Sequence, residues 1–209
     1  MKILLIGASG MVGSRILGEA LSRGHAVLAA VRDTTRLEPA KGVESIALDV
    51  NDAAAVAAQA AKVDVVISAV SPRNSGDAVE DARRFTEALI QVQRQTHKRL
   101  LMVGGGSTLQ MPNGQSVLEL TPAGILPEAT GMRQAYAMMV EADIDFAVLA
   151  PSGMIAPGER TGAFRIGGRT MLTGADGGKG RISAEDFAVA LLDEAEKPKH
   201  FRTVFTVGY

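Results

Sequence analysis

Three glycines that follow the first apolar segment carry the most informative spacing in the chain. The stretch ILLIGASGMVGS places Gly7, Gly10 and Gly13 after an expected strand and at the start of an expected helix. In such a loop the first glycine permits a tight turn, the second lets a pyrophosphate approach the backbone, and the third lets the helix pack on the sheet. Glycines that serve only an ordinary turn would not explain the surrounding strand and helix. We expect a dinucleotide phosphate site formed by Gly7, Ser9, Gly10, Met11, Val12 and Gly13, because amides at a helix N-terminus favour negative charge.

Basic side chains follow the second expected strand, in the stretch AAVRDTTR. Arg32 stands where NAD enzymes commonly have an acid that binds the ribose 2′-hydroxyl. Its guanidinium can hold a 2′-phosphate with paired hydrogen bonds, and Arg36 adds a second positive charge. The pattern favours NADP(H) as cofactor, while Asp33 keeps NAD(H) open. The alternative is that both arginines are solvated surface residues.

Small residues follow the fourth and fifth expected strands, in SAVSP and GGGSTL. Where the strand order of an open parallel sheet reverses, small residues let a dinucleotide cross the carboxyl edge of the sheet. We therefore add Ala69, Val70, Ser71 and Gly104 to the expected cofactor residues.

Apolar runs that alternate with helix-like segments must position these residues. The alternation predicts one α/β domain over residues 1–209, a doubly wound parallel sheet of Rossmann type with helices on both faces. The expected strands are 3–6, 26–31, 45–48, 63–68, 100–103, 146–149 and 204–207, and the expected helices are 11–22, 53–61, 79–95, 128–142 and 184–195. Ser183 is expected to cap the last helix.

The alternation stops in a glycine-rich excursion at about 151–182. Long ordered loops of this kind are commonly functional. Within it, the turn Gly167–Gly168 predicts a small hairpin that pairs 163–166 with 169–172.

Composition excludes several classes of function. With 22 basic and 23 acidic residues, the formal net charge of -1 gives no global attraction to nucleic acid or membranes. The basic residues Arg94, Lys98 and Arg99 lack interleaved aromatics, so no nucleic acid is expected as partner. No apolar run reaches membrane-spanning length, and no metal site is expected from three scattered histidines. The absence of cysteine is compatible with a reducing, cytoplasmic compartment.

Two C-terminal stretches extend the pattern, PSGMIAPGERTGAFRIGG and RISAEDFAVALLDEAEKPKHFRTVFTVGY. With GASGMVGS, they resemble the NAD(P)H-binding family described as NADH-flavin reductases, atypical short-chain dehydrogenases/reductases near NmrA-like proteins and biliverdin reductase B. PGERTG is the more distinctive piece, and the likeness covers nearly the whole chain. The GxxGxxG spacing is similar to that of the extended and atypical branches of the superfamily.

The resemblance implies further roles. Asp49 would accept from the adenine amino group and Val50 would lie against the ring, although Asp49 can instead cap the helix near Ala53. Pro151, Ser152 and Gly153 would border the nicotinamide. Ser107 would act there as a hydrogen-bonding or proton-relay residue, or only shape its turn.

The same likeness places the segment 159–162 at the pocket for the electron acceptor. Glu159 and Arg160 would form one wall of that pocket, and Arg160 would meet a flavin phosphate. The alternative is that both residues form surface ion pairs that stiffen the loop.

One departure concerns acid-base chemistry. Ordinary members of the superfamily have a tyrosine with a lysine four residues later, whereas this chain has Tyr136 and Val140. A phenol that titrates near 10 is a poor base at neutral pH. Tyr136 is therefore expected to be a packing or pocket residue that contacts substrate. Hydride transfer to a conjugated acceptor does not need a protein acid, because the acceptor is an electron sink and solvent can supply the proton.

These observations favour an NADPH-dependent oxidoreductase that reduces a small-molecule electron acceptor, with FMN, riboflavin or a quinone as candidates. The alternative is an NmrA-like sensor that binds NADP(H) without turnover. An epimerase is disfavoured by the missing lysine. The helix 79–95 can join a homodimer interface or bury its apolar face in its own core.

Overall fold

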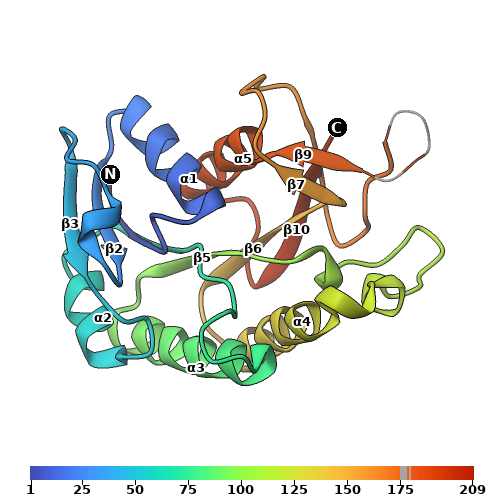
Figure 1. Ribbon diagram of the computed structural model, residues 1–209, viewed down its shortest axis with the longest axis horizontal. Helices are drawn as coiled ribbons and strands as arrows, with labels where there is room; N and C mark the ends of the chain where they lie inside the picture. Colours follow the sequence, from blue (N-terminus) through green and yellow to red (C-terminus); the bar gives the residue numbers. More distant parts are fainter. Residues whose placement is uncertain (175–177, 179) are drawn as a thin grey trace.

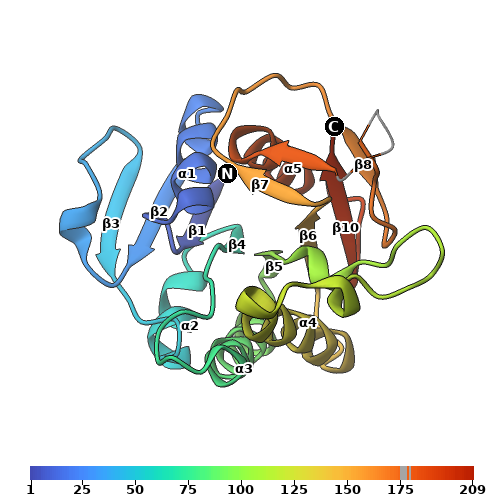
Figure 2. The ribbon, with the colours of Figure 1, turned by 45° about the vertical axis from the view of Figure 1, so that its right-hand side comes forward.

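A mostly parallel sheet forms the centre of the protein. The computed structural model describes residues 1–174, 178 and 180–209. Within them, the main sheet has eight strands in the order β3-β2-β1-β4-β5-β6-β10-β8 (Figures 1 and 2). Their bounds in that order are Val43–Ala47, Ala26–Val31, Lys2–Ile6, Val65–Ser68, Arg99–Val103, Phe146–Pro151, Thr203–Gly208 and Arg165–Gly167. All neighbouring pairs are parallel except β10 and β8, so the expected Rossmann-type sheet is confirmed.

Helices cover both faces of this sheet (Figure 1). On one face lie α1 (Met11–Ser22) and α5 (Ala184–Glu196), and on the other lie α2 (Ala53–Ala60), α3 (Ala78–Thr96) and α4 (Leu126–Glu141). The central strands are apolar on both sides because each side is buried: Leu4 packs in the core beneath α2, α3 and α4, and Ile3 in the core beneath α1 and α5. Short 3-10 turns occur at η1 (Thr34–Arg36), η2 (Gly106–Thr108), η3 (Val117–Leu120) and η4 (Ala123–Ile125).

Side-chain caps define the starts of three helices. Asp52 accepts from the Ala55 amide at 3.0 Å at the start of α2, and Asp77 accepts from two amides of α3. Ser183 Oγ accepts from the Asp186 amide at 3.0 Å, as expected for α5. The cap of α2 is therefore Asp52, and the suggestion that Asp49 has this role is wrong.

The glycine-rich excursion contains no hairpin of the predicted kind among its described residues. β8 pairs with β10 at the edge of the main sheet (Figure 2), whereas Thr170 bridges to Gln110. The predicted pairing of 163–166 with 169–172 is wrong because each arm finds its backbone partners in another part of the chain. β7 (Met154–Ala156) and β9 (Arg181–Ser183) form a separate parallel pair. Residues 175–177 and 179 of the excursion lie outside the described part.

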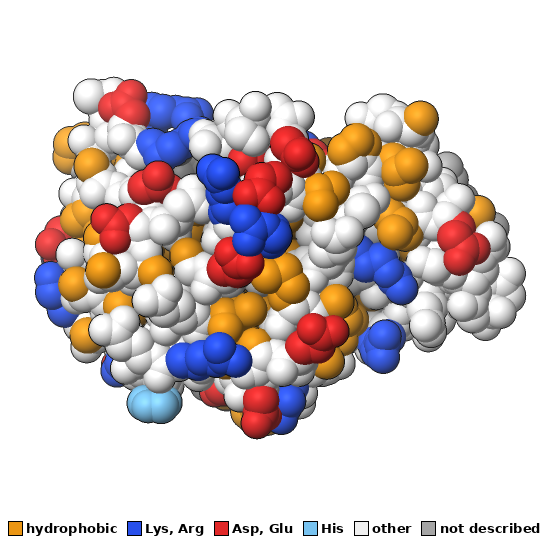
Figure 3. Space-filling model, turned by 90° about the horizontal axis from the view of Figure 1, so that it is seen from below, with side chains coloured by type: hydrophobic (Ala, Val, Ile, Leu, Met, Phe, Trp, Pro, Cys, Tyr) orange, Lys and Arg blue, Asp and Glu red, His pale blue; other side chains and the backbone are white. Residues whose placement is uncertain are grey.

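The apolar face of α3 is buried in the protein's own core through Ala82, Phe85, Leu89 and Val92. The solvent face is charged, with Arg83 and Arg84 paired to acidic neighbours. Figure 3, which views the side of α3 and α4, shows basic and acidic side chains next to one another. The core accounts for the apolar pattern of this helix, and a homodimer stays a prediction.

Across the described residues, no helix has both the length and the apolar character needed to span a bilayer.

Candidate functional site

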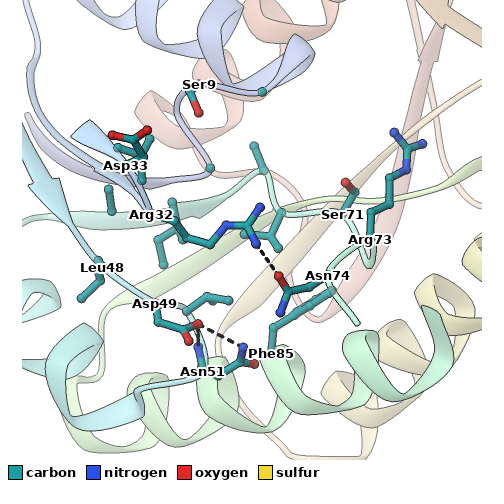
Figure 4. Close-up of a pocket in the computed structure, with 18 of the residues that line it drawn as sticks. Ser9, Arg32, Asp33, Leu48, Asp49, Asn51, Ser71, Arg73, Asn74 and Phe85 are labelled. Carbon is teal, nitrogen blue, oxygen red and sulfur yellow. Dashed lines mark hydrogen bonds between the residues drawn. The ribbon is translucent and has the colours of Figure 1, made fainter. Parts of the chain in front are cut away.

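A cavity of about 550 Å³ lies at the carboxyl ends of β1, β2, β3 and β4 (Figure 4). The strand order reverses at β1, which has β2 on one side and β4 on the other. Ligands of open α/β sheets bind at such a reversal. The predicted residues that the cavity brings together are Gly7, Ser9, Gly10, Arg32, Arg36, Asp49, Val50, Ala69, Val70 and Ser71.

The glycine loop is shaped by two close backbone approaches. Gly7 has a φ of +84°, and a Cβ at this position would lie 2.9 Å from the carbonyl oxygen of Ala69. A Cβ on Gly13 would lie 2.0 Å from the carbonyl oxygen of Gly7, so only glycine lets α1 start this close to the turn. Together these approaches bring the first turn of α1 to the end of β1.

No side chain in the described part of the protein caps the N-terminus of α1. Its N-cap residue, Gly10, lines the cavity and has no side-chain hydrogen bond, and the first turn contains no acidic residue. The amides of the first turn, from Met11 to Gly13, have no intrahelical acceptor. Side chains cap α2, α3 and α5 but neither α1 nor α4. Of the two uncapped helices, α1 is the one whose N-cap residue lines the cavity, and it presents its open amides and positive dipole end there. This donor set fits the pyrophosphate of a dinucleotide.

Arg32 and Asp33 both line the cavity; Arg32 extends into it, whereas the Asp33 carboxylate is hydrogen-bonded to Thr35 (Figure 4). Arg32 Nη1 donates to the side-chain oxygen of Asn74. Asp33 accepts from the hydroxyl and the amide of Thr35, at 2.7 and 3.0 Å, and these bonds lower the pKa of its carboxyl. Arg36 also lines the cavity, so two guanidinium groups follow β2 at its carboxyl end.

The end of β3 is ordered by a local turn. Asp49 accepts from the amide and the side-chain nitrogen of Asn51, at 2.9 and 3.0 Å. Val50 lines the cavity and packs against the core below. This segment therefore presents a carboxylate beside an apolar surface.

Several cavity residues were missed from the sequence, and the polar ones include Arg73 and Asn74, between β4 and α3, and Asp81 in the first turn of α3. Asp81, only 7% exposed, accepts from the amides of Asn74 and Ser75 at 2.6 and 2.8 Å. These bonds, the Ser75 amide first, lower the pKa of the Asp81 carboxyl. Arg73 forms a two-point ion pair with Glu128 of α4, at 2.9 and 3.1 Å. The only sequence signal was the polar stretch RNSGD before the helix. The other missed lining residues are Ile6, Ala30, Val31, Leu48, Asn51 and Phe85.

The sequence profile of the NAD(P)H-binding family matches residues 7–198, from the glycine loop through α5. This chain belongs to the NAD(P)H-binding family. YwnB of Bacillus subtilis, itself uncharacterized, is 33% identical over 217 residues, covering 99% of this chain and 98% of YwnB.

Two solved structures are similar to this protein over its whole length. A candidate epimerase from Bacteroides thetaiotaomicron has a TM-score of 0.92 at 34% identity, covering 100% of this chain and 96% of that one. A candidate NADH-flavin reductase from Streptococcus pneumoniae has a TM-score of 0.88 at 25% identity, covering 100% of this chain and 99% of that one.

In this family member, the residues expected beside the nicotinamide lie along the ends of β5 and β6 and do not line the cavity within the described part. Ser152 is fully buried; its hydroxyl pairs with Thr206 at 2.7 Å and accepts from the Leu172 amide at 3.0 Å. The Ser152 hydroxyl is thus hydrogen-bonded within the protein itself. Gly104, Pro151 and Gly153 pack at the same edge, where a Cβ on Gly153 would lie 2.0 Å from the Gly180 carbonyl oxygen.

The two hydroxyl residues considered for chemistry are both buried. Ser107 Oγ donates to the Ala129 carbonyl oxygen at 2.8 Å, which fits the turn-shaping alternative. Tyr136 is 9% exposed and packs edge-on against Phe146, with ring centroids 6.3 Å apart. Tyr136 belongs to the core on the α4 side of the sheet and does not line this cavity, which fits the packing alternative; contact with substrate stays a prediction.

The PGERTG segment lies over α1 and α5. Arg160 binds Glu19 of α1, and the Glu159 carbonyl oxygen accepts from Ser183 Oγ at 2.7 Å. The ion-pair alternative describes Arg160 in this structure, because the buried Glu19 carboxylate needs charged partners. The acceptor wall formed by Glu159 and Arg160 stays a prediction.

Proposed function

We propose that this protein is an NADPH-dependent reductase that transfers a hydride to a flavin, a quinone or a related conjugated acceptor. Membership of the NAD(P)H-binding family supports the dinucleotide. The preference for NADPH is carried by one observation: the Arg32 guanidinium lies inside the cavity while the neighbouring Asp33 carboxylate is bound to Thr35.

The cavity residues divide the cofactor among them in this proposal. The open amides of α1 hold the pyrophosphate, with Ser9 beside them. Arg32 and Arg36 hold the 2′-phosphate, since paired charge-assisted hydrogen bonds suit a guanidinium. Asp49 and Val50 contact the adenine. Ala69, Val70 and Ser71 lie beneath the part of the dinucleotide that leads to the nicotinamide.

The acceptor side supports chemistry that needs no protein acid. Reduced nicotinamide supplies a hydride when bound, and a conjugated acceptor stabilises the electron pair and takes its proton from solvent. Ser107 and Tyr136 have no part in such a reaction, and the protein contributes orientation. FMN and riboflavin are the acceptors we propose first, because the Streptococcus pneumoniae structure carries the name of an NADH-flavin reductase.

A second candidate is an NmrA-like sensor that binds NADP(H) and signals to a protein partner without turnover. The sensor is favoured because Ser107 and Tyr136 are buried and neither lines the cavity, so within the described residues no tyrosine and lysine pair faces it. An epimerase is less compatible, because Val140 stands four residues after Tyr136 and is solvent-exposed.

Nucleotide binding tests the cofactor part of the proposal. Titration of the full chain with NADPH and with NADH is expected to show tighter binding of NADPH. Arg32→Ala should weaken NADPH about 10- to 100-fold, the range of charge-assisted hydrogen bonds, and NADH at most about twofold. Arg169→Ala, which removes an exposed arginine outside the cavity, is the matched control. Tighter binding of NADH by the wild type, or equal losses for both nucleotides in Arg32→Ala, would contradict the proposal.

A further inference from the structure

Arg32 reaches across the cavity to a residue that sequence patterns did not single out. Its Nη1 donates to Asn74 Oδ1, and Asn74 belongs to the segment between β4 and α3 (Figure 4). Arg32 and Asn74 are both exposed and 42 residues apart. Since a free arginine side chain samples many rotamers, this contact selects those that point into the cavity.

The contact leaves most of the guanidinium available. Arg32 Nε and Nη2 make no hydrogen bond within the described part of the chain. Arginine carries five donors in a planar fork, so one edge can hold Asn74 while the other forms a paired contact with a phosphate. Asn74 therefore orients Arg32 without competing for the group that Arg32 would bind.

Asn74 is itself held by a buried anchor. Asp81 accepts from the Asn74 amide at 2.6 Å and from the Ser75 amide at 2.8 Å, and its side chain is 7% exposed. Arg73 fastens the same segment to Glu128 of α4. A fixed backbone makes the Asn74 side chain a fixed reference point for Arg32.

We propose that Asn74 is a positioning residue that sets the preference for NADPH by holding Arg32 where the 2′-phosphate binds. The inference rests on the proposed function, because it assumes NADPH as the preferred cofactor. It predicts that Asn74 affects the two nucleotides unequally, although both use the rest of the cavity.

The test is calorimetric titration of the full chain with NADPH and NADH, for the wild type and a set of variants. Asn74→Ala should weaken NADPH about three- to tenfold, the range for one hydrogen bond, and change NADH less than about twofold. Asn74→Asp should weaken NADPH more than Asn74→Ala does, because a carboxylate would lie beside the phosphate. Asn113→Ala, in an exposed turn outside the cavity, is the matched control and should match the wild type.

A double variant separates positioning from a merely structural role. If Asn74 acts through Arg32, Asn74→Ala should cause no further loss of NADPH affinity in an Arg32→Ala background. Equal losses for both nucleotides, unchanged NADPH affinity in Asn74→Ala, or additive losses in the double variant would overturn the inference. A wild type that binds NADPH no better than NADH would instead refute the proposed cofactor preference, and the inference with it.

Discussion

The carboxylate of Glu19 on α1 binds the guanidinium of Arg160 at two points, with distances of 2.7 and 2.9 Å, although the residues are 141 positions apart. Arg23 reaches the same carboxylate at 2.7 Å. Next to this ion pair, the fully buried Asp186 accepts from the amides of Thr161 and Gly162 at 2.9 and 2.8 Å. The PGERTG segment is thus fastened across α1 and α5 by carboxylates of both helices.

Arg160→Ala is expected to destabilise the fold without affecting nucleotide binding. The change leaves Glu19, 5% exposed, with Arg23 as its remaining partner, so we expect the free energy of unfolding to fall. Urea denaturation measures this loss, with Arg169→Ala as the control. A stable Arg160→Ala variant with weakened NADPH binding would return Arg160 to the cofactor or acceptor site.

Glu19 also predicts how stability depends on pH. Hydrogen bonds from Arg160, the largest cause, and from Arg23 lower the pKa of Glu19 to about 2. A lowered folded-state pKa stabilises the protein above the unfolded value, near 4.5, and this contribution is lost as the pH falls toward 2. The expected contribution is at most about 3 kcal/mol. Glu19→Gln should therefore show a shallower fall in stability between these pH values, and identical pH profiles would contradict this assignment.

Two glycines of α1 should respond oppositely to alanine. Gly13→Ala places a Cβ 2.0 Å from the Gly7 carbonyl oxygen, so α1 must shift away from the turn. We expect a loss of about 2–4 kcal/mol in stability, the range of severe overpacking, and a loss of NADPH affinity. Gly18→Ala, on the same helix with open space around it, should raise stability by about 0.5–1 kcal/mol and leave affinity unchanged. Thermal unfolding and nucleotide titration of both variants test the contrast; equal behaviour would contradict it.

Ser107→Ala tests whether this hydroxyl takes part in proton transfer. Because Ser107 Oγ donates to the Ala129 carbonyl oxygen, we expect a loss of about 1 kcal/mol in stability and a change in kcat of less than about threefold. Steady-state kinetics with NADPH and each acceptor measure the effect. A loss in kcat of about a hundredfold, as for removal of a general acid, would place Ser107 at the chemistry.

The elements that position the cofactor site were predictable because they follow local periodicity. The first helix has the predicted bounds, Met11–Ser22, and Ser183 caps the last helix as its type and place indicate. The glycine loop was predictable for the same reason, since its signal lies within seven residues between a strand and a helix.

The contacts that depend on tertiary packing were not predictable. Asn74 lies at the cavity because Asp81 anchors its backbone and because its side chain meets Arg32, which follows β2. Arg160 forms an ion pair with Glu19 of the first helix. The strand that contains Arg165 pairs with β10 at the edge of the main sheet instead of forming a local hairpin. Each of these pairings joins segments that are distant in the sequence, so neither residue type nor spacing identifies the partner.

The measurement that tests the central claim most directly is the oxidation of NADPH, followed by absorbance, with FMN, riboflavin and a simple quinone offered separately. We predict turnover with at least one acceptor, at a rate that falls in Arg32→Ala when NADPH is limiting. Tight binding of NADPH without oxidation by any acceptor in the panel would contradict the reductase assignment and favour the nucleotide sensor.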